Sequence, residues 1–191
     1  RVRGMKRVQV EPHLSVTGAC SAEWVPIRPK TDAAFLYAMM HVMLHEAARE
    51  RLDIDYLKQR TSAPYLIAPN GYFLRDPDTR KPLLWDRTTG AAVPFDRPGT
   101  DPMLEGTVTV DGLEVGPDHE SWDHRGIACR TAFDLLVDHS TPHTPEWASE
   151  ICDVPADQVR RIATEFLDHA RIGETIDIDG EELPLRPVAI A

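Results

Sequence analysis

Two short groups of polar residues could bind an anionic or nucleotide-like ligand. They follow the first two apolar segments of this 191-residue chain and comprise Glu11, Pro12 and His13 in one group and Lys30, Thr31 and Asp32 in the other. A carboxylate can accept hydrogen bonds from ribose hydroxyls or from the paired N–H donors of a guanine edge, whereas lysine and histidine suit phosphate. The same residue types are typical of ordinary turns and helix caps, so their spacing alone leaves both interpretations open.

Two strands and a helix are expected to position these groups. Residues 5–11 alternate polar and apolar side chains and predict a strand, and residues 24–27 predict a second short strand. From Thr31 onward, apolar residues at helical spacing predict a helix to about Arg51, with Thr31 or Asp32 as its cap. Because the carboxyl ends of neighbouring strands border the ligand crevice of an open α/β sheet, we expect both groups at that edge.

Two histidine-containing clusters offer other chemistry. His41 and His45 lie four residues apart on the predicted helix, beside Glu46. They lack the HExxH arrangement and an identifiable third ligand, so two polar positions on an amphipathic helix are the simpler interpretation. Loop 118–125 combines histidines with carboxylates and suits a solvated loop, the mouth of a pocket or a hydrolytic metal site. The sequence has no GxSxG elbow, Walker loop or GxGxxG, so it holds no self-contained catalytic constellation.

The middle of the chain differs in character from its beginning. Asp53 is a predicted cap for a short helix at Ile54–Gln59. Prolines then punctuate residues 62–117, which predicts an irregular β-rich insertion. Within that insertion, Thr107–Val115 has the pattern of a hairpin with its turn at Asp111–Gly112.

Residues 128–173 are predicted to be mainly helical. The expected helices cover Ala128–Leu136, a segment capped by Thr144 with Pro145 at its first position, and a segment opened by Pro155. Beyond them, Thr175–Gly180 predicts a small hairpin arm and Arg186–Ile190 a returning core strand. Strands at both ends with long helices between them predict a three-layer, Rossmann-like α/β fold.

The composition excludes several classes of function. The chain carries 31 acidic against 21 basic residues, a net charge of −10, which opposes nonspecific binding to nucleic acid. Its three cysteines are far apart, so an iron–sulfur or cysteine-rich zinc site within this chain is not expected. No apolar run approaches the roughly 20 residues of a membrane span, so direct membrane insertion is not expected either.

Two motifs resemble the molybdopterin oxidoreductases of the dimethyl-sulfoxide-reductase superfamily. The first is Trp24-Val25-Pro26-Ile27-Arg28-Pro29-Lys30-Thr31-Asp32-Ala33-Ala34 with the helix behind it, similar to a family run W-I-P-I-R-P-G-T-D-A-A-L. The second is Thr144-Pro145-Glu146-Trp147-Ala148, continuing through Val154-Pro155-Ala156 to Arg160-Arg161-Ile162-Ala163. Residues 64–86 and 186–188 are also similar to one branch, so the likeness covers most of the chain.

The resemblance implies a role for the two polar groups. In that family the corresponding loops help to hold the guanosine and phosphate portion of molybdopterin guanine dinucleotide, which carries molybdenum or tungsten. Carried over to this chain, the resemblance places Asp32 against the nucleoside. It places His13 and Lys30 near phosphate or ribose. The chain departs from the family pattern where Glu11 and His13 replace the commoner Asp and Arg, and where Lys30 replaces Gly or Gln.

The resemblance also implies a larger enzyme. Residues 1–191 then form an internal cofactor-binding segment of a catalytic subunit that performs two-electron redox chemistry. The iron–sulfur cluster and the metal ligand would lie in other parts of that subunit, and an iron–sulfur electron-transfer subunit would be its partner. The location, prokaryotic cytoplasm or periplasm, stays open. Two alternatives remain: a non-catalytic α/β binding module, and the hydrolytic metal site in loop 118–125.

Overall fold

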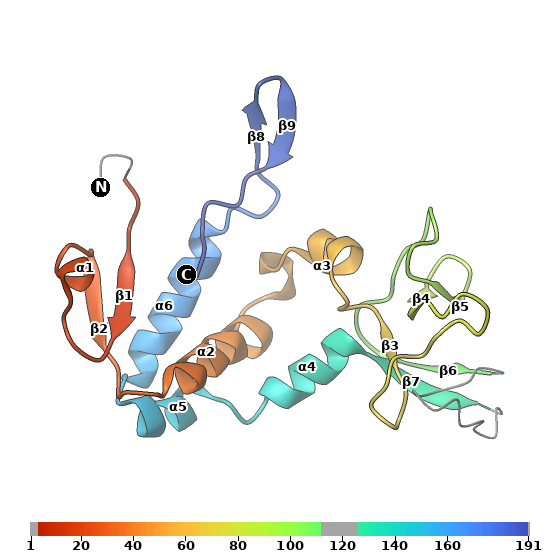
Figure 1. Ribbon diagram of the computed structural model, residues 1–191, viewed down its shortest axis with the longest axis horizontal. Coiled ribbons are helices and arrows are strands. Elements are labelled where there is room, and N and C mark those ends of the chain that lie inside the picture. Colours follow the sequence, from red (N-terminus) through yellow and green to blue (C-terminus); the bar gives the residue numbers. More distant parts are fainter. Residues whose placement is uncertain (1–3, 112–125, 191) are drawn as a thin grey trace. The chain divides into compact units, whose positions relative to one another are not determined.

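The chain forms two compact units. The computed structural model describes residues 4–111 and 126–190 (Figure 1). One unit comprises Arg1–Leu52 and Ser140–Ala191, and the other comprises Asp53–His139. We refer to them as the parallel-strand unit and the antiparallel unit, after the strand pairings described below.

The parallel-strand unit begins with the two predicted strands. Strand β1 (Val8–Glu11) runs parallel to β2 (Glu23–Pro26), with Val8 opposite Glu23 and Glu11 opposite Pro26. A single-turn helix, α1 (Val16–Ala19), lies on the connection between them. Strand β1 is shorter than the predicted segment 5–11, and β2 is shifted from the predicted segment 24–27. The existence and order of these two strands are confirmed.

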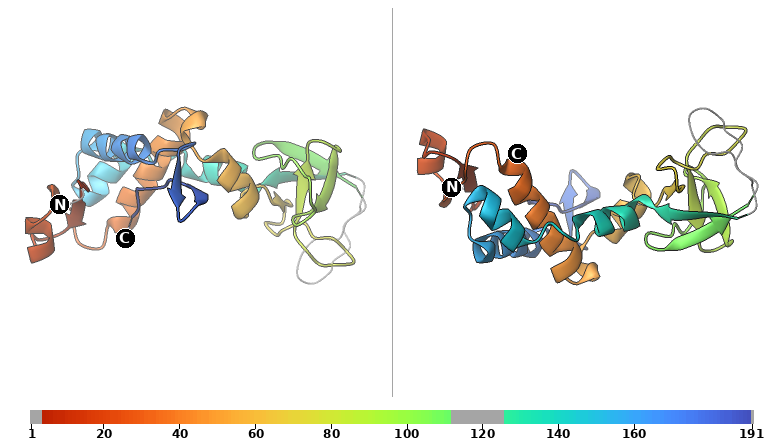
Figure 2. Two further views of the ribbon diagram at one scale, coloured as in Figure 1. Left: turned by 90° about the horizontal axis from the view of Figure 1, so that it is seen from above. Right: turned by 90° about the horizontal axis from the view of Figure 1, so that it is seen from below.

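Three helices supply the core of this unit. They are α2 (Asp32–His41), α5 (Pro145–Cys152) and α6 (Ala156–His169), which lie side by side in Figures 1 and 2. Buried side chains of these helices pack with Val25 and Ile27 into one hydrophobic cluster. The predicted cap of α5 is confirmed, because the Thr144 hydroxyl accepts a hydrogen bond from the Trp147 N–H at 3.2 Å.

The helix predicted to run to about Arg51 ends earlier. After His41 the backbone widens into a π-helical turn at Val42–Glu46, closed by a hydrogen bond from Ala47 N to Val42 O at 2.9 Å. The Arg49 side chain donates to Leu44 O, so a carbonyl at the helix end is satisfied without another helical turn. A separate 3₁₀ turn follows at Arg49–Arg51.

The antiparallel unit contains short strands around a second core. Helix α3 (Ile54–Arg60) opens it, and the Asp53 carboxylate caps that helix as predicted by accepting from Tyr56 N. The strands are β3 (Leu66–Ile67), β4 (Leu83–Asp86), β5 (Ala91–Pro94), β6 (Thr107–Val110) and β7 (Ile127–Thr131). Their sheets, β3-β7-β6 and β4-β5, are antiparallel.

One prediction for this unit needs correction. The segment Ala128–Leu136 is not one helix: β7 occupies Ile127–Thr131 and α4 occupies Ala132–Ser140. Burial alternates along β7, as a half-buried strand requires, and the helical pattern that follows obscures this period in the sequence. Strand β6 coincides with the first half of the predicted Thr107–Val115 hairpin and pairs with β7; the expected turn at Gly112 and the second strand of that hairpin lie outside the described residues.

A hairpin and an irregular tail complete the parallel-strand unit. The predicted arm at Thr175–Gly180 is confirmed as the first half of a hairpin, β8 (Thr175–Ile178) and β9 (Glu181–Pro184). The core strand predicted at Arg186–Ile190 is wrong, because this segment has no regular structure and no described strand pairs with it. None of the described helices is long and apolar enough to cross a membrane. Parallel strands packed with helices confirm the α/β class, with small sheets.

Candidate functional site

The carboxyl ends of β1 and β2 lie at one edge of the parallel pair. The register matches Glu11 with Pro26, so both strands end level with each other. The Trp24 indole N–H crosses from β2 and donates to Glu11 O at 3.1 Å, which ties the ends together. The two loops that carry the predicted ligand-binding residues therefore leave the same edge of the sheet, as the sequence predicts for a ligand crevice.

The first loop is organised by Glu11 and Ser15. The Glu11 carboxylate accepts hydrogen bonds from Ser15 N at 2.8 Å and from the Ser15 hydroxyl at 2.7 Å. The same hydroxyl oxygen caps α1 by accepting from Gly18 N at 3.1 Å. A Cβ at Gly18 would lie 2.3 Å from Glu11 Oε1, so any other residue at this position would displace the carboxylate from its present place. These contacts hold the loop while Pro12 and His13 stay exposed.

The Ser15 contacts give a testable pH effect. The backbone N–H and then the hydroxyl of Ser15 lower the pKa of Glu11 below its ordinary value. Because the folded pKa lies below the unfolded pKa, this interaction stabilises the fold above the unfolded pKa and fades as pH falls through the lowered one. We expect Ser15→Ala to raise the pKa of Glu11 in a carboxyl NMR titration, whereas Ser15→Thr keeps the hydroxyl and the low pKa. An unchanged pKa in the alanine variant would contradict this assignment.

Arg28 holds the second loop in place, although its spacing in the sequence does not mark it as a residue of the site. Its backbone N–H donates to Cys152 O at 2.9 Å, and its guanidinium forms two hydrogen bonds with the Asp153 carboxylate at 3.0 and 2.8 Å. Asp153 has a left-handed backbone (φ 62°) directly after α5. The partners are 125 residues apart in sequence, so only the fold reveals the pair.

The second loop ends at the start of α2. Lys30 turns the chain with φ 67°, and the Thr31 hydroxyl donates backward to Arg28 O at 2.6 Å. Thr31 occupies the cap position of α2, as predicted, although its side chain makes no capping hydrogen bond. The first amides of a helix have no intrahelical acceptor and favour an anion, and exposed Asp32 stands beside them.

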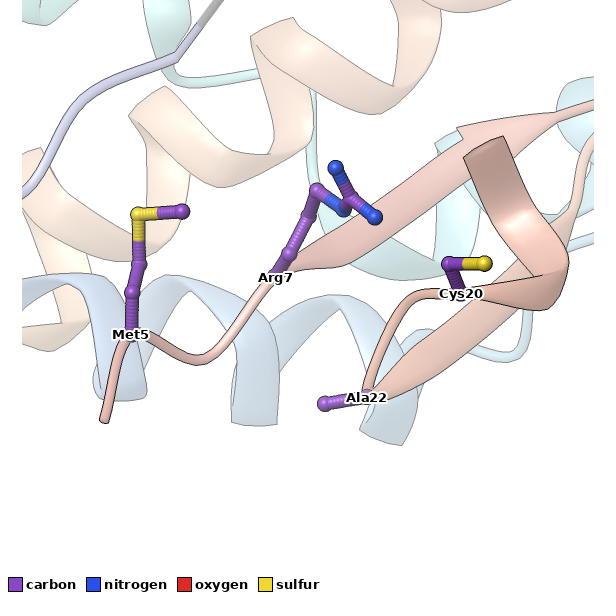
Figure 3. Close-up of a pocket in the computed structure, with 4 residues that line it drawn as sticks. All are labelled: Met5, Arg7, Cys20 and Ala22. Atoms are coloured by element: carbon purple, nitrogen blue, oxygen red, sulfur yellow. The ribbon is translucent and has the colours of Figure 1, made fainter. Parts of the chain in front are cut away.

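A small hollow lies at the opposite end of the strand pair. It measures about 180 Å³ and is lined by Met5, Arg7, Cys20 and Ala22 (Figure 3). Arg7 donates to Ser21 Oγ and to Thr17 O, so its side chain is engaged with the α1 connection. These residues precede β1 and β2, whereas the predicted ligand-binding residues follow them. The hollow therefore includes none of the predicted residues.

The His41–His45 pair, the first of the two other predicted clusters, contacts Ser140. His41 is buried with Nδ1 3.0 Å from Ser140 O, and His45 Nε2 lies 2.9 Å from the Ser140 hydroxyl. The two rings stack at 4.7 Å, and no group of three possible metal ligands occurs among residues 4–111 and 126–190. Loop 118–125, the alternative hydrolytic site, lies outside the described residues.

Comparison with known proteins identifies relatives along most of the chain. It is 34% identical over 179 residues to a sulfite dehydrogenase subunit of Allochromatium vinosum, and the match covers 86% of this chain and 17% of the relative. It is 28% identical over 170 residues to the alpha subunit of the chlorate reductase of Ideonella dechloratans, covering 85% and 18%. It is 27% identical over 162 residues to dimethyl sulfoxide reductase DmsA of Escherichia coli, covering 84% and 13%. A scan against models of protein families found no match.

These relatives are catalytic subunits of molybdenum enzymes, and together they define the class. The chain belongs to the dimethyl-sulfoxide-reductase superfamily of molybdopterin oxidoreductases, which confirms the resemblance indicated by the two motifs. It spans less than a fifth of the length of these curated relatives.

Proposed function

We propose that this chain is the part of a molybdenum or tungsten oxidoreductase that holds the guanosine and phosphate tail of bis-molybdopterin guanine dinucleotide. One observation carries the proposal: parallel pairing of β1 and β2 sends both polar loops from one edge, and one of them leads directly into the amino terminus of α2. Helix amino termini and basic side chains bind phosphate, and a carboxylate binds the guanine edge. The residues present fit both ends of such a ligand.

Each predicted residue has a role in this proposal. The exposed Asp32 carboxylate accepts from the guanine N–H donors, and exposed Lys30 and His13 contact the diphosphate or ribose. Glu11 orients the first loop through Ser15, and its remaining acceptor capacity suits a ribose hydroxyl. Pro12 and Thr31 shape the two loops, since proline restricts the backbone and Thr31 bonds back to Arg28 O.

The whole enzyme supplies what this chain does not. The bound cofactor brings a metal centre capable of two-electron oxidation or reduction by oxygen-atom or hydride transfer. The chain's own residues bind and orient the tail of that cofactor. We propose that its partners are an iron–sulfur electron-transfer subunit and the rest of the catalytic subunit, whose own iron–sulfur cluster lies outside residues 1–191.

Metal and pterin analysis of the full-length protein tests this function. We expect molybdenum or tungsten together with pterin fluorescence after oxidation and guanine nucleotide after hydrolysis. Absence of both metals from active protein would overturn the redox assignment and favour the non-catalytic binding module. Metal and pterin without guanine would leave the oxidoreductase class intact but contradict the role of Asp32.

A further inference from the structure

The loop between β2 and α2 is attached at Arg28 to the connection between α5 and α6. The Arg28 guanidinium forms two hydrogen bonds with the Asp153 carboxylate, and this forked geometry gives Arg–carboxylate pairs their directional preference. The residues that flank the pair are buried in one hydrophobic cluster; they are Ile27, Cys152 and Val154. The pair therefore joins two segments that packing already holds at their bases.

The backbone of Asp153 indicates that its carboxylate has a role beyond the helix end. Asp153 follows α5 in the left-handed conformation, with φ 62°, a position where glycine is the usual residue because it has no Cβ. The helix end itself uses only the backbone, since Asp153 N donates to Ser149 O at 3.1 Å. Glycine would satisfy α5 equally well, whereas the carboxylate is what Arg28 requires.

The position of Arg28 is transmitted to the residues of the candidate site. Arg28 O accepts the hydrogen bond from the Thr31 hydroxyl at 2.6 Å, which closes the turn that leads into α2. Within that turn, Pro29 restricts the backbone and Lys30 has φ 67°. Asp32 follows directly as the first residue of α2. The fork between Arg28 and Asp153 thus anchors the turn that carries Lys30 and Asp32.

We propose that Asp153 is a positioning residue for the candidate site. Acting through Arg28, it holds residues 28–32 in the shape that receives the ligand before the ligand binds. A preformed loop loses less conformational freedom on binding, so the ligand is held more tightly. Because both side chains of the pair are more than half exposed, the pair contributes little to the stability of the whole fold. The inference rests on the proposed function for the identity of the ligand.

Hydrogen exchange in the full-length protein tests the effect on the loop. Asp153→Gly removes the carboxylate at a position where glycine adopts positive φ without strain, so thermal stability should stay about unchanged. Exchange in peptides that cover residues 28–35 should become faster by about threefold to fivefold, the upper range for an exposed ion pair. Arg28→Gln should have the same effect, and the double variant should exchange no faster than either single variant, because the two residues act as a unit. Unchanged exchange, or effects that add in the double variant, would overturn the proposal.

A second ion pair in the same unit provides the matched control. Arg51 pairs with Asp168 near the end of α6, and the Asp168 side chain is 56% exposed against 62% for Asp153. Asp168→Asn and Asp153→Asn therefore remove the same charge from similar surroundings. Only the Asp153 variant should accelerate exchange in residues 28–35. Equal acceleration in both variants would overturn the assignment to Asp153.

Release of the bound ligand separates positioning from a purely structural role. Guanine dinucleotide should leave the Asp153→Gly protein at least about threefold faster than the unmodified protein, at unchanged thermal stability, and at the normal rate from the Asp168→Asn protein. Faster loop exchange with normal release would overturn the positioning role. Absence of guanine dinucleotide from the unmodified protein would overturn the proposed function, whereas the exchange measurements need no bound ligand and decide the contribution of Asp153 to the loop separately.

Discussion

Replacing Asp32 with Asn is expected to lower the guanine dinucleotide content of the full-length protein by about tenfold to a hundredfold. Asparagine keeps the shape of the side chain but removes the negative charge and one of the two acceptor oxygens. A hydrogen bond to a charged group contributes about 1.5–3 kcal/mol, which corresponds to that range of affinity. Guanine released by acid hydrolysis, expressed relative to bound metal, measures the effect.

Asp157 provides the matched control for this experiment. It is an exposed aspartate in the first turn of α6, as Asp32 is in the first turn of α2. Asp157→Asn therefore removes the same charge from an equivalent helix position outside the proposed site, and the cofactor content should stay normal. Equal guanine content in the Asp32 and Asp157 variants would refute the assignment of Asp32 to the nucleoside.

Truncating Phe35 to Ala is expected to destabilise α2 by about 3–5 kcal/mol. Phe35 is 4% exposed within the cluster that joins α2, α5, α6 and β2, so its removal leaves a cavity where neighbouring side chains pack. Hydrogen exchange of α2 amides in the full-length protein measures the local effect. Exchange should be faster by at least about a hundredfold, because each 1.4 kcal/mol is a factor of ten.

A control variant at the neighbouring residue, Leu36, distinguishes the loss of packing from a change in helix propensity. Leu36 is 40% exposed against 4% for Phe35, so Leu36→Ala removes less buried surface and should change exchange by a smaller factor than Phe35→Ala. The Phe35 variant should also lose cofactor, since the same helix begins with Asp32. If the α2 amides exchanged at the same rate in both alanine variants, packing in the hydrophobic cluster around Phe35 would not be what stabilises α2.

The local elements near the candidate site follow directly from local chemistry. Thr144 and Pro145 predict the start of α5, and Asp53 predicts the start of α3, because a side-chain oxygen before an apolar helix satisfies the first free amides. The hairpin arm at 175–180 follows from Asp179-Gly180, which readily adopt positive φ. Each of these signals lies within a few residues, so no knowledge of the fold is needed.

Predictions that depend on distant partners failed. Arg186–Ile190 has an apolar composition, but a strand also requires a neighbour to accept its backbone hydrogen bonds, and no described strand pairs with it. Ala128–Leu136 has apolar residues that fit two periods, and only pairing with β3 and β6 decides that its first part is a strand. The helix predicted after Thr31 extends too far because a π turn changes the hydrogen-bond register without a clear sequence signal.

The sequence by itself determined the superfamily, the two polar groups and the first two strands, because motifs and alternation are local properties of the chain. Tertiary structure alone decided how the second loop is held. The Arg28–Asp153 pair joins residues 125 positions apart. The reason is physical: local signals specify backbone conformation, whereas the partner of a polar side chain depends on which distant segments packing brings within hydrogen-bond distance.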